Sequence, residues 1–134
     1  MLELAYLVTL AIVFGGMVTF QLLFAPLVFT QLSTRVARGF IRGFFPFYYL
    51  FFAMFSSLGL ALAWLRGDWP GASALAACTI GYLFCRQVLT PQANAASDAG
   101  DLQRFRWIHN GTVAVNTVQL LLVFWLLYRL APLR

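Results

Sequence analysis

Four long apolar runs, separated by short polar segments, organise the chain. They cover about residues 4–29, 44–64, 72–89 and 107–130. A helix needs about 20 mainly apolar residues to cross the roughly 30 Å hydrocarbon layer of a membrane, whereas a barrel strand needs only about 9–11 and alternates. The runs have helical length, and apolar and polar positions do not alternate in them. The pattern therefore predicts an all-α integral membrane bundle of four transmembrane helices, forming a single domain over residues 1–134.

The segment that follows the first run, STRVARGFIRG, has an amphipathic pattern. Its arginines recur at i, i+3 and i+7, which places them on one face of a helix with apolar side chains opposite. They are Arg35, Arg38 and Arg42. Such a pattern is typical of a short helix in the headgroup layer, with its arginines contacting lipid headgroups. A cytoplasmic extension of the first helix is the alternative.

Composition supports the membrane interpretation. Hydrophobic residues make up 62% of the chain and charged residues 10%, against about 45–50% and about 25% in soluble domains. These charges are too few to cover a globule in water. The net charge of +5 does not indicate nucleic acid, because the arginines flank apolar runs, where they meet anionic headgroups. We therefore expect the lipid bilayer, and no nucleic acid, as a partner.

The distribution of arginine predicts the orientation, because loops on the cytoplasmic side carry an excess of basic residues. One side has Arg35, Arg38 and Arg42 after the first run and Arg86, Arg104 and Arg106 after the third. The other side has only Arg66, Arg129 and Arg134. We therefore expect a multi-pass protein of the bacterial inner (plasma) membrane, with both termini outside, in the periplasm.

Polar side chains interrupt the fourth apolar run on one face. His109, Thr112, Asn116 and Gln119 fall within about 80° on a helical wheel. Unpaired polar groups in hydrocarbon cost several kcal/mol, so this face is predicted to look into the bundle. Gln21 in the first run lies at a matching depth and is predicted to hydrogen-bond with Asn116. Gln21, Thr112, Asn116 and Gln119 form the predicted polar seam, either an interhelical hydrogen-bond network or part of a functional site.

The single histidine is the candidate ligand, because ionisable residues inside membranes are candidates for function. His109 lies near the membrane boundary, where it is equally suited to bonding a loop carbonyl. Cys78 and Cys85 are about 10 Å apart along a helix, beyond the roughly 7 Å Cα separation of a disulfide. We therefore expect two buried, free cysteines. The identity of any metal stays unknown, no cofactor is expected, and haem bound by His109 is the alternative.

The segment RFRWIHNGTVAVNTVQLL, together with FGGMVTFQLLFAPLVFTQL and GFFPFYYLF, resembles the transmembrane protein 205-like family. The matching positions are Gly16, Met17, Phe20, Pro26, Phe29, Phe45, Pro46, Tyr48, Arg104, Phe105, His109, Asn116 and Leu120. The resemblance implies a four-helix membrane protein and no established reaction. APLVF and FRWIHN are more weakly similar to HemJ-type protoporphyrinogen oxidases and copper-resistance D-like proteins. Those proteins carry a histidine in their first helix, which this chain lacks.

Candidate chemistry within the spans is sparse. No span carries a carboxylate pair, and the sequence has no Ser-His-Asp set and no glycine-rich phosphate loop, so an enzyme is not favoured. The preferred hypothesis is a non-enzymatic scaffold or accessory subunit of a membrane complex, whose partners are other membrane subunits or further copies of the chain. A haem- or porphyrin-associated protein using His109 is the alternative, and an oligomeric metal-ion or small-solute conduit is a further one.

Overall fold

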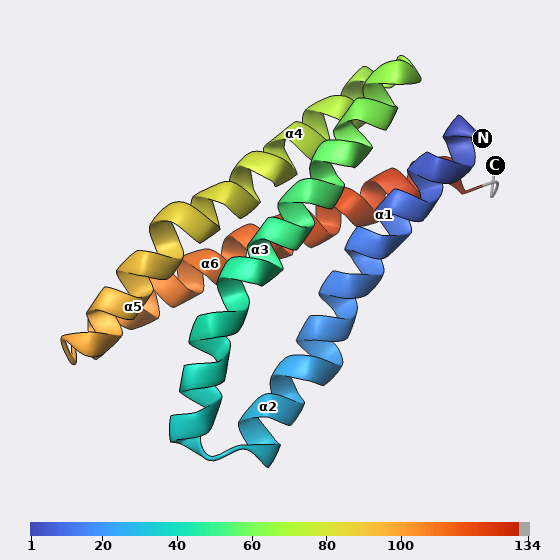
Figure 1. Cartoon of the computed structure of the whole chain (residues 1–134). Helices are drawn as coiled ribbons and strands as arrows, with labels where there is room; N and C mark the ends of the chain where they lie inside the picture. The colour runs from blue at the N-terminus through green and yellow to red at the C-terminus, as the bar shows by residue number, and fades with distance from the viewer. Residues whose placement is uncertain (132–134) are drawn as a thin grey trace.

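The computed structural model describes residues 1–131 as a bundle of four long helical spans (Figure 1). They are Leu2–Gln31, Thr34–Leu65, Trp69–Asp98 and Leu102–Leu130, each long and apolar enough to cross a membrane. Consecutive spans are joined by short turns, so the start of the first span and the end of the fourth lie at the same end of the bundle. The predicted all-α fold with four membrane-length helices is confirmed.

Two of the four spans contain a π-helical turn. The elements are α1 Leu2–Thr19, η1 Phe20–Phe24, α2 Ala25–Gln31, α3 Thr34–Leu65, α4 Trp69–Phe84, η2 Cys85–Leu89, α5 Thr90–Asp98 and α6 Leu102–Leu130. A proline follows each π-turn, Pro26 after η1 and Pro91 after η2. Proline lacks an N–H and clashes with the carbonyl four residues earlier. The wider π-turn accommodates both effects, so each helix continues past its proline.

The polar segment before the fourth span differs from its prediction. The sequence predicts that Pro91 ends the third helix, that a solvated loop follows, and that the fourth helix begins near Trp107. Instead α5 continues to Asp98 and α6 begins at Leu102. Gly100 forms the turn with a φ of 71°, a backbone region in which glycine has no steric penalty. The third and fourth spans are therefore longer than their apolar runs.

The basic segment after the first span is helical but is not a separate interfacial helix. It forms the first turns of α3, which runs without interruption from Thr34 to Leu65. It extends the second span, not the first, because Leu32 is extended and Ser33 takes the N-cap position. Pro46 consequently lies well inside α3 rather than in its first turn.

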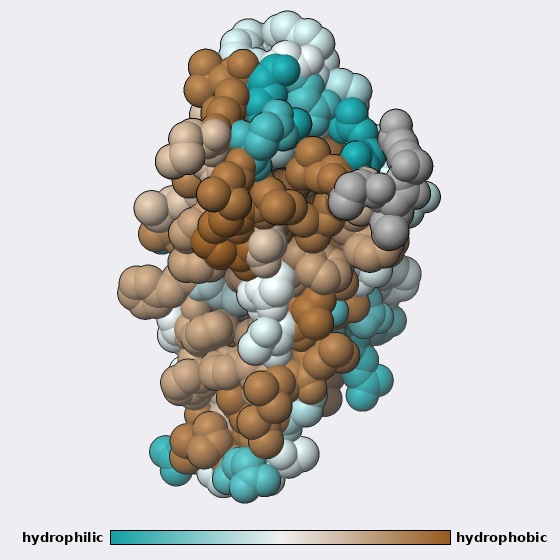
Figure 2. All heavy atoms as spheres, turned by 90° about the vertical axis from the view of Figure 1, so that its right-hand side faces the viewer, coloured by the Kyte–Doolittle hydropathy of each residue, from teal (hydrophilic) through white to brown (hydrophobic). Residues whose placement is uncertain are grey.

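Large side chains from all four spans fill the centre of the bundle. The largest fully buried ones include Tyr6, Leu10, Met17, Tyr49, Leu75, Tyr82 and Leu126. α3 and α4 pack along most of their length, whereas α2 contacts only η1 and α3 among the described elements. Figure 2 shows hydrophobic residues across the middle of one face and hydrophilic residues toward its two ends. This distribution matches a protein that spans a bilayer.

Candidate functional site

The polar face of α6 looks into the bundle, as its periodicity predicts. Gln119 is 3% exposed, and its Nε2 donates a hydrogen bond of 2.9 Å to the Cys78 carbonyl of α4. Asn116 Nδ2 donates to the Thr112 carbonyl at 2.9 Å and reaches the Tyr49 hydroxyl of α3 at 3.5 Å. Two of the seam's polar residues, Gln119 and Asn116, thus connect α6 to both neighbouring helices of the hydrocarbon region.

Two oxygens of this polar face have no hydrogen-bond donor. Asn116 Oδ1 and Gln119 Oε1 are both buried and unpartnered within residues 1–131. Unpaired buried acceptors cost about 1–3 kcal/mol each. The interior of the bundle is therefore not fully satisfied by the residues that the structure describes.

Gln21, the fourth residue of the predicted seam, is separate from the other three. Its side chain is exposed and makes no hydrogen bond to any described residue, so the predicted bond between Gln21 and Asn116 is wrong. No Cα atom of η1 or α2 lies within 8 Å of α6. The matched depth of the two residues is not sufficient, because α1 and α6 diverge from the end that holds the N-terminus (Figure 1).

His109 is exposed on α6 and lies parallel to the Phe105 ring, with centroids 5.9 Å apart and an interplanar angle of 10°. No group of three or more His, Cys, Asp and Glu side chains suited to a metal occurs within residues 1–131. The described residues thus do not surround the imidazole as a haem site would. Ligation by His109 stays a prediction, and it requires groups from a second molecule.

Both cysteines are buried and free, as the sequence predicts. Cys78 lies beside the Gln119 contact, and Cys85 is the first residue of η2. Tyr82, between them in the chain, donates its hydroxyl to Met17 Sδ at 2.8 Å. These groups occupy the interior contact between α4 and α1 side chains as packing residues.

Ion pairs that the sequence reasoning missed connect the helices at the end that holds the N-terminus. Arg66 binds Glu3 through two contacts, Nε to Oε1 at 2.8 Å and Nη2 to Oε2 at 2.6 Å. The Arg66 guanidinium also lies 4.5 Å above the centre of the Tyr6 ring. Arg129 Nη1 lies 3.0 Å from Asp68 Oδ1. The available signal was an acidic residue at the start of the first and third spans and an arginine at the end of the second and fourth.

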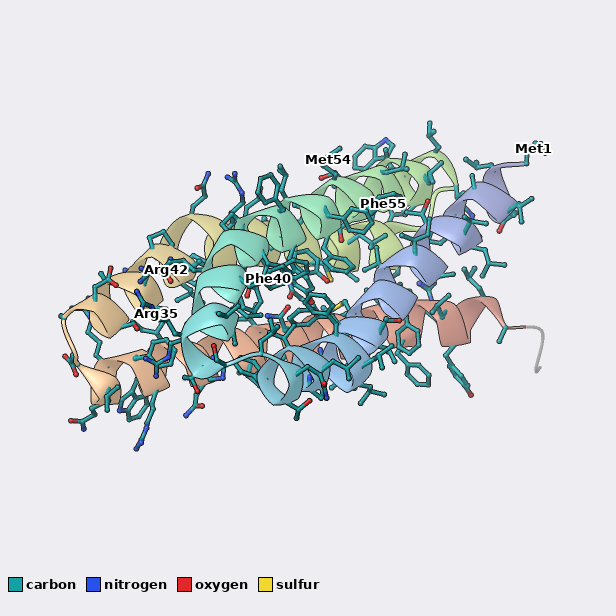
Figure 3. All side chains as sticks on the ribbon, turned by 60° about the horizontal axis from the view of Figure 1, so that its bottom comes forward. Met1, Arg35, Phe40, Arg42, Met54 and Phe55 are labelled. Atoms are coloured by element: carbon teal, nitrogen blue, oxygen red, sulfur yellow. The ribbon has the colours of Figure 1, made fainter. Side chains whose placement is uncertain are left out.

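The opposite end carries the excess positive charge. Arg42 binds Asp98 at 2.7 Å and the Asn94 carbonyl at 3.1 Å, which joins α3 to α5. Arg35 and Arg38 are exposed, and their contact with lipid headgroups stays a prediction. Figure 3 shows Arg35 and Arg42 at the end of the bundle formed by α5 and the start of α3.

Arg86 does not lie in a loop, where the orientation argument places it. It belongs to η2 and, at 1.5 Å per residue, lies about 4 Å from the midpoint of its span. Its Nε donates to the Pro46 carbonyl of α3 at 3.1 Å, and it has no carboxylate partner among the described residues. An arginine at this depth joins the third span to the second.

An apolar cleft of about 660 Å³ lies between the first span and α3. Its lining is largely aromatic and consists of Gly16, Thr19, Phe20, Phe24, Phe44, Phe47, Tyr48, Leu50, Phe51, Phe52 and Met54. The cleft forms where α2 separates from α3. It indicates that the half of the bundle beyond η1 is the less tightly packed one.

Four membrane-length helices, interior amide contacts and helix-joining ion pairs at the ends define this chain as a multi-pass integral membrane protein. Residues 8–101 match the family described as a domain of unknown function (DUF4149), and the chain belongs to that family. No curated protein and no solved structure matches it. The resemblances to the transmembrane protein 205-like and HemJ-type families are not shown by these comparisons.

Proposed function

We propose that this protein is a non-enzymatic scaffold or accessory subunit of a membrane complex, and that the outer face of α6 binds its partner. The observation that carries the proposal is the position of Asn110. Its exposed side chain lies about 180° around the helix from the buried residue Gln119. Asn110 therefore faces away from the bundle.

The depth of Asn110 makes this exposure costly in lipid. At 1.5 Å per residue, Asn110 lies about 9 Å from the midpoint of the fourth span, within the roughly 30 Å hydrocarbon layer. An amide without a partner in hydrocarbon costs several kcal/mol, whereas interhelical hydrogen bonds contribute about 0.6–2 kcal/mol. A transmembrane helix of another subunit or copy removes this cost by bonding the amide.

The burial of the four spans supports the same face. Only 17% of the apolar window of the fourth span is buried, against 39% for the second. Leu121, which is 60% exposed, lies within about 20° of Asn110 on the outer side of α6. The fourth span thus offers the largest uncovered helix surface, with a polar group on it.

Site-specific photo-crosslinking in intact membranes tests the partner face. A photoreactive amino acid at Leu121 should give a discrete protein adduct, and the same group at Ile80, which is 68% exposed on α4, should not. Asn110→Leu should lower the Leu121 adduct about fivefold, because it removes about 1 kcal/mol of interhelical hydrogen bonding. Equal labelling from both positions, or an adduct unaffected by Asn110→Leu, contradicts the proposal.

We also propose an inner-membrane location with both termini outside. The support is the charge balance after pairing. At the end that holds the N-terminus, Arg66 and Arg129 are both bound to carboxylates. At the other end, Arg35, Arg38, Arg104 and Arg106 are outside the ion pairs of the described chain. Excess unpaired positive charge favours the cytoplasmic side; Arg134 lies outside the described residues.

Thiol labelling in intact cells tests this orientation. In a Cys78→Ala, Cys85→Ala background, Ser97→Cys on α5 should resist membrane-impermeant thiol reagents and react after the cells are permeabilised. Leu2→Cys, at the opposite end, should react without permeabilisation. Rapid labelling of Ser97→Cys in intact cells shows that the chain has the reverse orientation.

A further inference from the structure

The first and third spans contain the same interruption at the same position. η1 spans Phe20–Phe24 and η2 spans Cys85–Leu89, each five residues long. Each is followed by a proline at the second position, Pro26 and Pro91. π-turns are rare, so two of them separated by the same 65 residues as their prolines indicate a repeated unit.

The buried faces of the two spans follow the same register. In the first span the buried stripe is Tyr6, Leu10, Val13 and Met17, and in the third it is Gly71, Leu75, Cys78 and Tyr82. Each position in the second list lies 65 residues after its counterpart. Because a helix buries a stripe set by its period of 3.6 residues, the equal offset means that both spans present equivalent faces to the core.

Equivalent glycines make equivalent contacts with the next span of each half. A Cβ atom on Gly16 would lie 2.9 Å from Cζ of Phe52 on α3. A Cβ atom on Gly81 would lie 2.6 Å from Nε2 of Gln119 on α6. The glycines are 65 residues apart and their partners 67 residues apart. Both halves thus use a glycine for close helix approach.

The ion pairs at the end that holds the N-terminus repeat in the same way. Glu3 at the start of the first span binds Arg66 just after the second. Asp68 just before the third span binds Arg129 near the end of the fourth. Each half therefore joins the start of its first helix to the end of its second by one carboxylate–arginine pair.

The contacts between halves differ in one respect. Arg86, in η2, donates to the Pro46 carbonyl, and Cα atoms of η2 lie within 8 Å of α3. Gln21 occupies the equivalent position in η1, but no Cα atom of η1 lies within 8 Å of α6. The 67-residue offset of the second helices makes Val113 the counterpart of Pro46. Val113 is 50% exposed, so neither side of this second interface is covered.

We infer that the chain consists of two copies of one helical hairpin in parallel arrangement, and that the α1–α6 interface closes so that Gln21 contacts α6 near Val113, as Arg86 contacts α3. Parallel internal repeats related by an axis along the membrane normal occur in other membrane proteins. α1 and α4 each contact both α3 and α6, as this symmetry requires. The open interface departs from the symmetry only beyond η1.

The first span is built to bend at η1. The π-turn and Pro26 both replace regular helical hydrogen bonding, and such points are where helices kink. Beyond them, α2 makes no side-chain hydrogen bond or ion pair to another described helix, since Thr30 bonds only carbonyls of its own helix. The equivalent α5 is held to α3 by Arg42. The first span alone is free to bend, and closure places the Gln21 amide next to α6.

Disulfide trapping of the full chain in lipid bilayers tests this closure. A disulfide needs Cα atoms within about 7 Å, a separation that η1 and α6 do not reach in this structure. In a Cys78→Ala, Cys85→Ala background, the pair Gln21→Cys and Val113→Cys should form an intramolecular disulfide on mild oxidation. Leu23→Cys with Val113→Cys is the matched control and should not, because Leu23 lies on the opposite side of the turn from Gln21.

A distance measurement supports the test without relying on cysteine reactivity between helices. Spin labels at Thr30 and Asn110, both exposed, should show a short-distance population that Gln21→Leu removes and Gln21→Arg retains. Phe14→Cys with Phe124→Cys, whose rings lie 5.9 Å apart, is the positive control for trapping between α1 and α6. Closure is overturned if this control pair links while Gln21→Cys and Val113→Cys link only between chains or not at all.

Discussion

Asp68→Asn should destabilise the folded bundle by about 2–4 kcal/mol. The Asp68 side chain is 15% exposed and lies 3.0 Å from Arg129, which is 31% exposed. Removing one partner of a buried pair leaves an uncompensated charge and typically costs about 3–5 kcal/mol; the partial exposure of Arg129 lowers this figure. Asp68 Oδ1 also accepts from Gly71 N–H at 3.1 Å as the N-cap of α4, a role that asparagine keeps. The substitution therefore isolates the effect of charge.

Unfolding by increasing the detergent SDS in mixed micelles, followed by helical circular dichroism, measures this loss. Asp98→Asn is the matched control, because Asp98 and Arg42 are 65% and 45% exposed and exposed pairs contribute less than about 1 kcal/mol. Arg129→Gln in the Asp68→Asn background should recover part of the stability by removing the unpaired charge. Equal unfolding midpoints for Asp68→Asn and Asp98→Asn would show that Asp68 has no special role.

Gly81→Ala should cost about 1–3 kcal/mol although it adds one methyl group. The added Cβ atom would lie 2.6 Å from Gln119 Nε2 and would push the amide away from the Cys78 carbonyl. Gln119 is 3% exposed, so the displaced amide finds no water. An unsatisfied buried donor of this kind costs about 1–3 kcal/mol, more than the helix propensity that alanine gains over glycine, about 1 kcal/mol.

A double-mutant cycle measured by the same unfolding method separates this contact from other effects. In the Gln119→Ala background the steric conflict is absent, so Gly81→Ala should cost little, giving a coupling energy of about 1–2 kcal/mol. Gly15→Ala is the control, because nothing lies within 4 Å of its added Cβ atom, and it should be neutral or stabilising. Additive effects of Gly81→Ala and Gln119→Ala would mean that the two residues do not interact energetically.

The sequence alone predicts the four spans and the inward face of α6. Hydrocarbon leaves no partner for backbone groups, so apolar runs of membrane length must be helical. The helical period then places Thr112, Asn116 and Gln119 on one side, and the cost of unpaired polar groups directs that side inward. Asn116 and Gln119 do bond to α3 and α4. These conclusions need only local periodicity and the properties of the solvent.

The tertiary structure alone decides which residues from different spans meet. Depth arguments place Gln21 opposite Asn116, but a pairing also requires the helices to run close together, and α1 and α6 diverge there. Likewise Pro91 does not end its helix, because η2 accommodates the proline. The ion pairs connect residues 61 and 63 positions apart, separations that carry no periodic signal. Helix direction, crossing and register depend on the packing of all four spans together, which no single segment of the chain encodes.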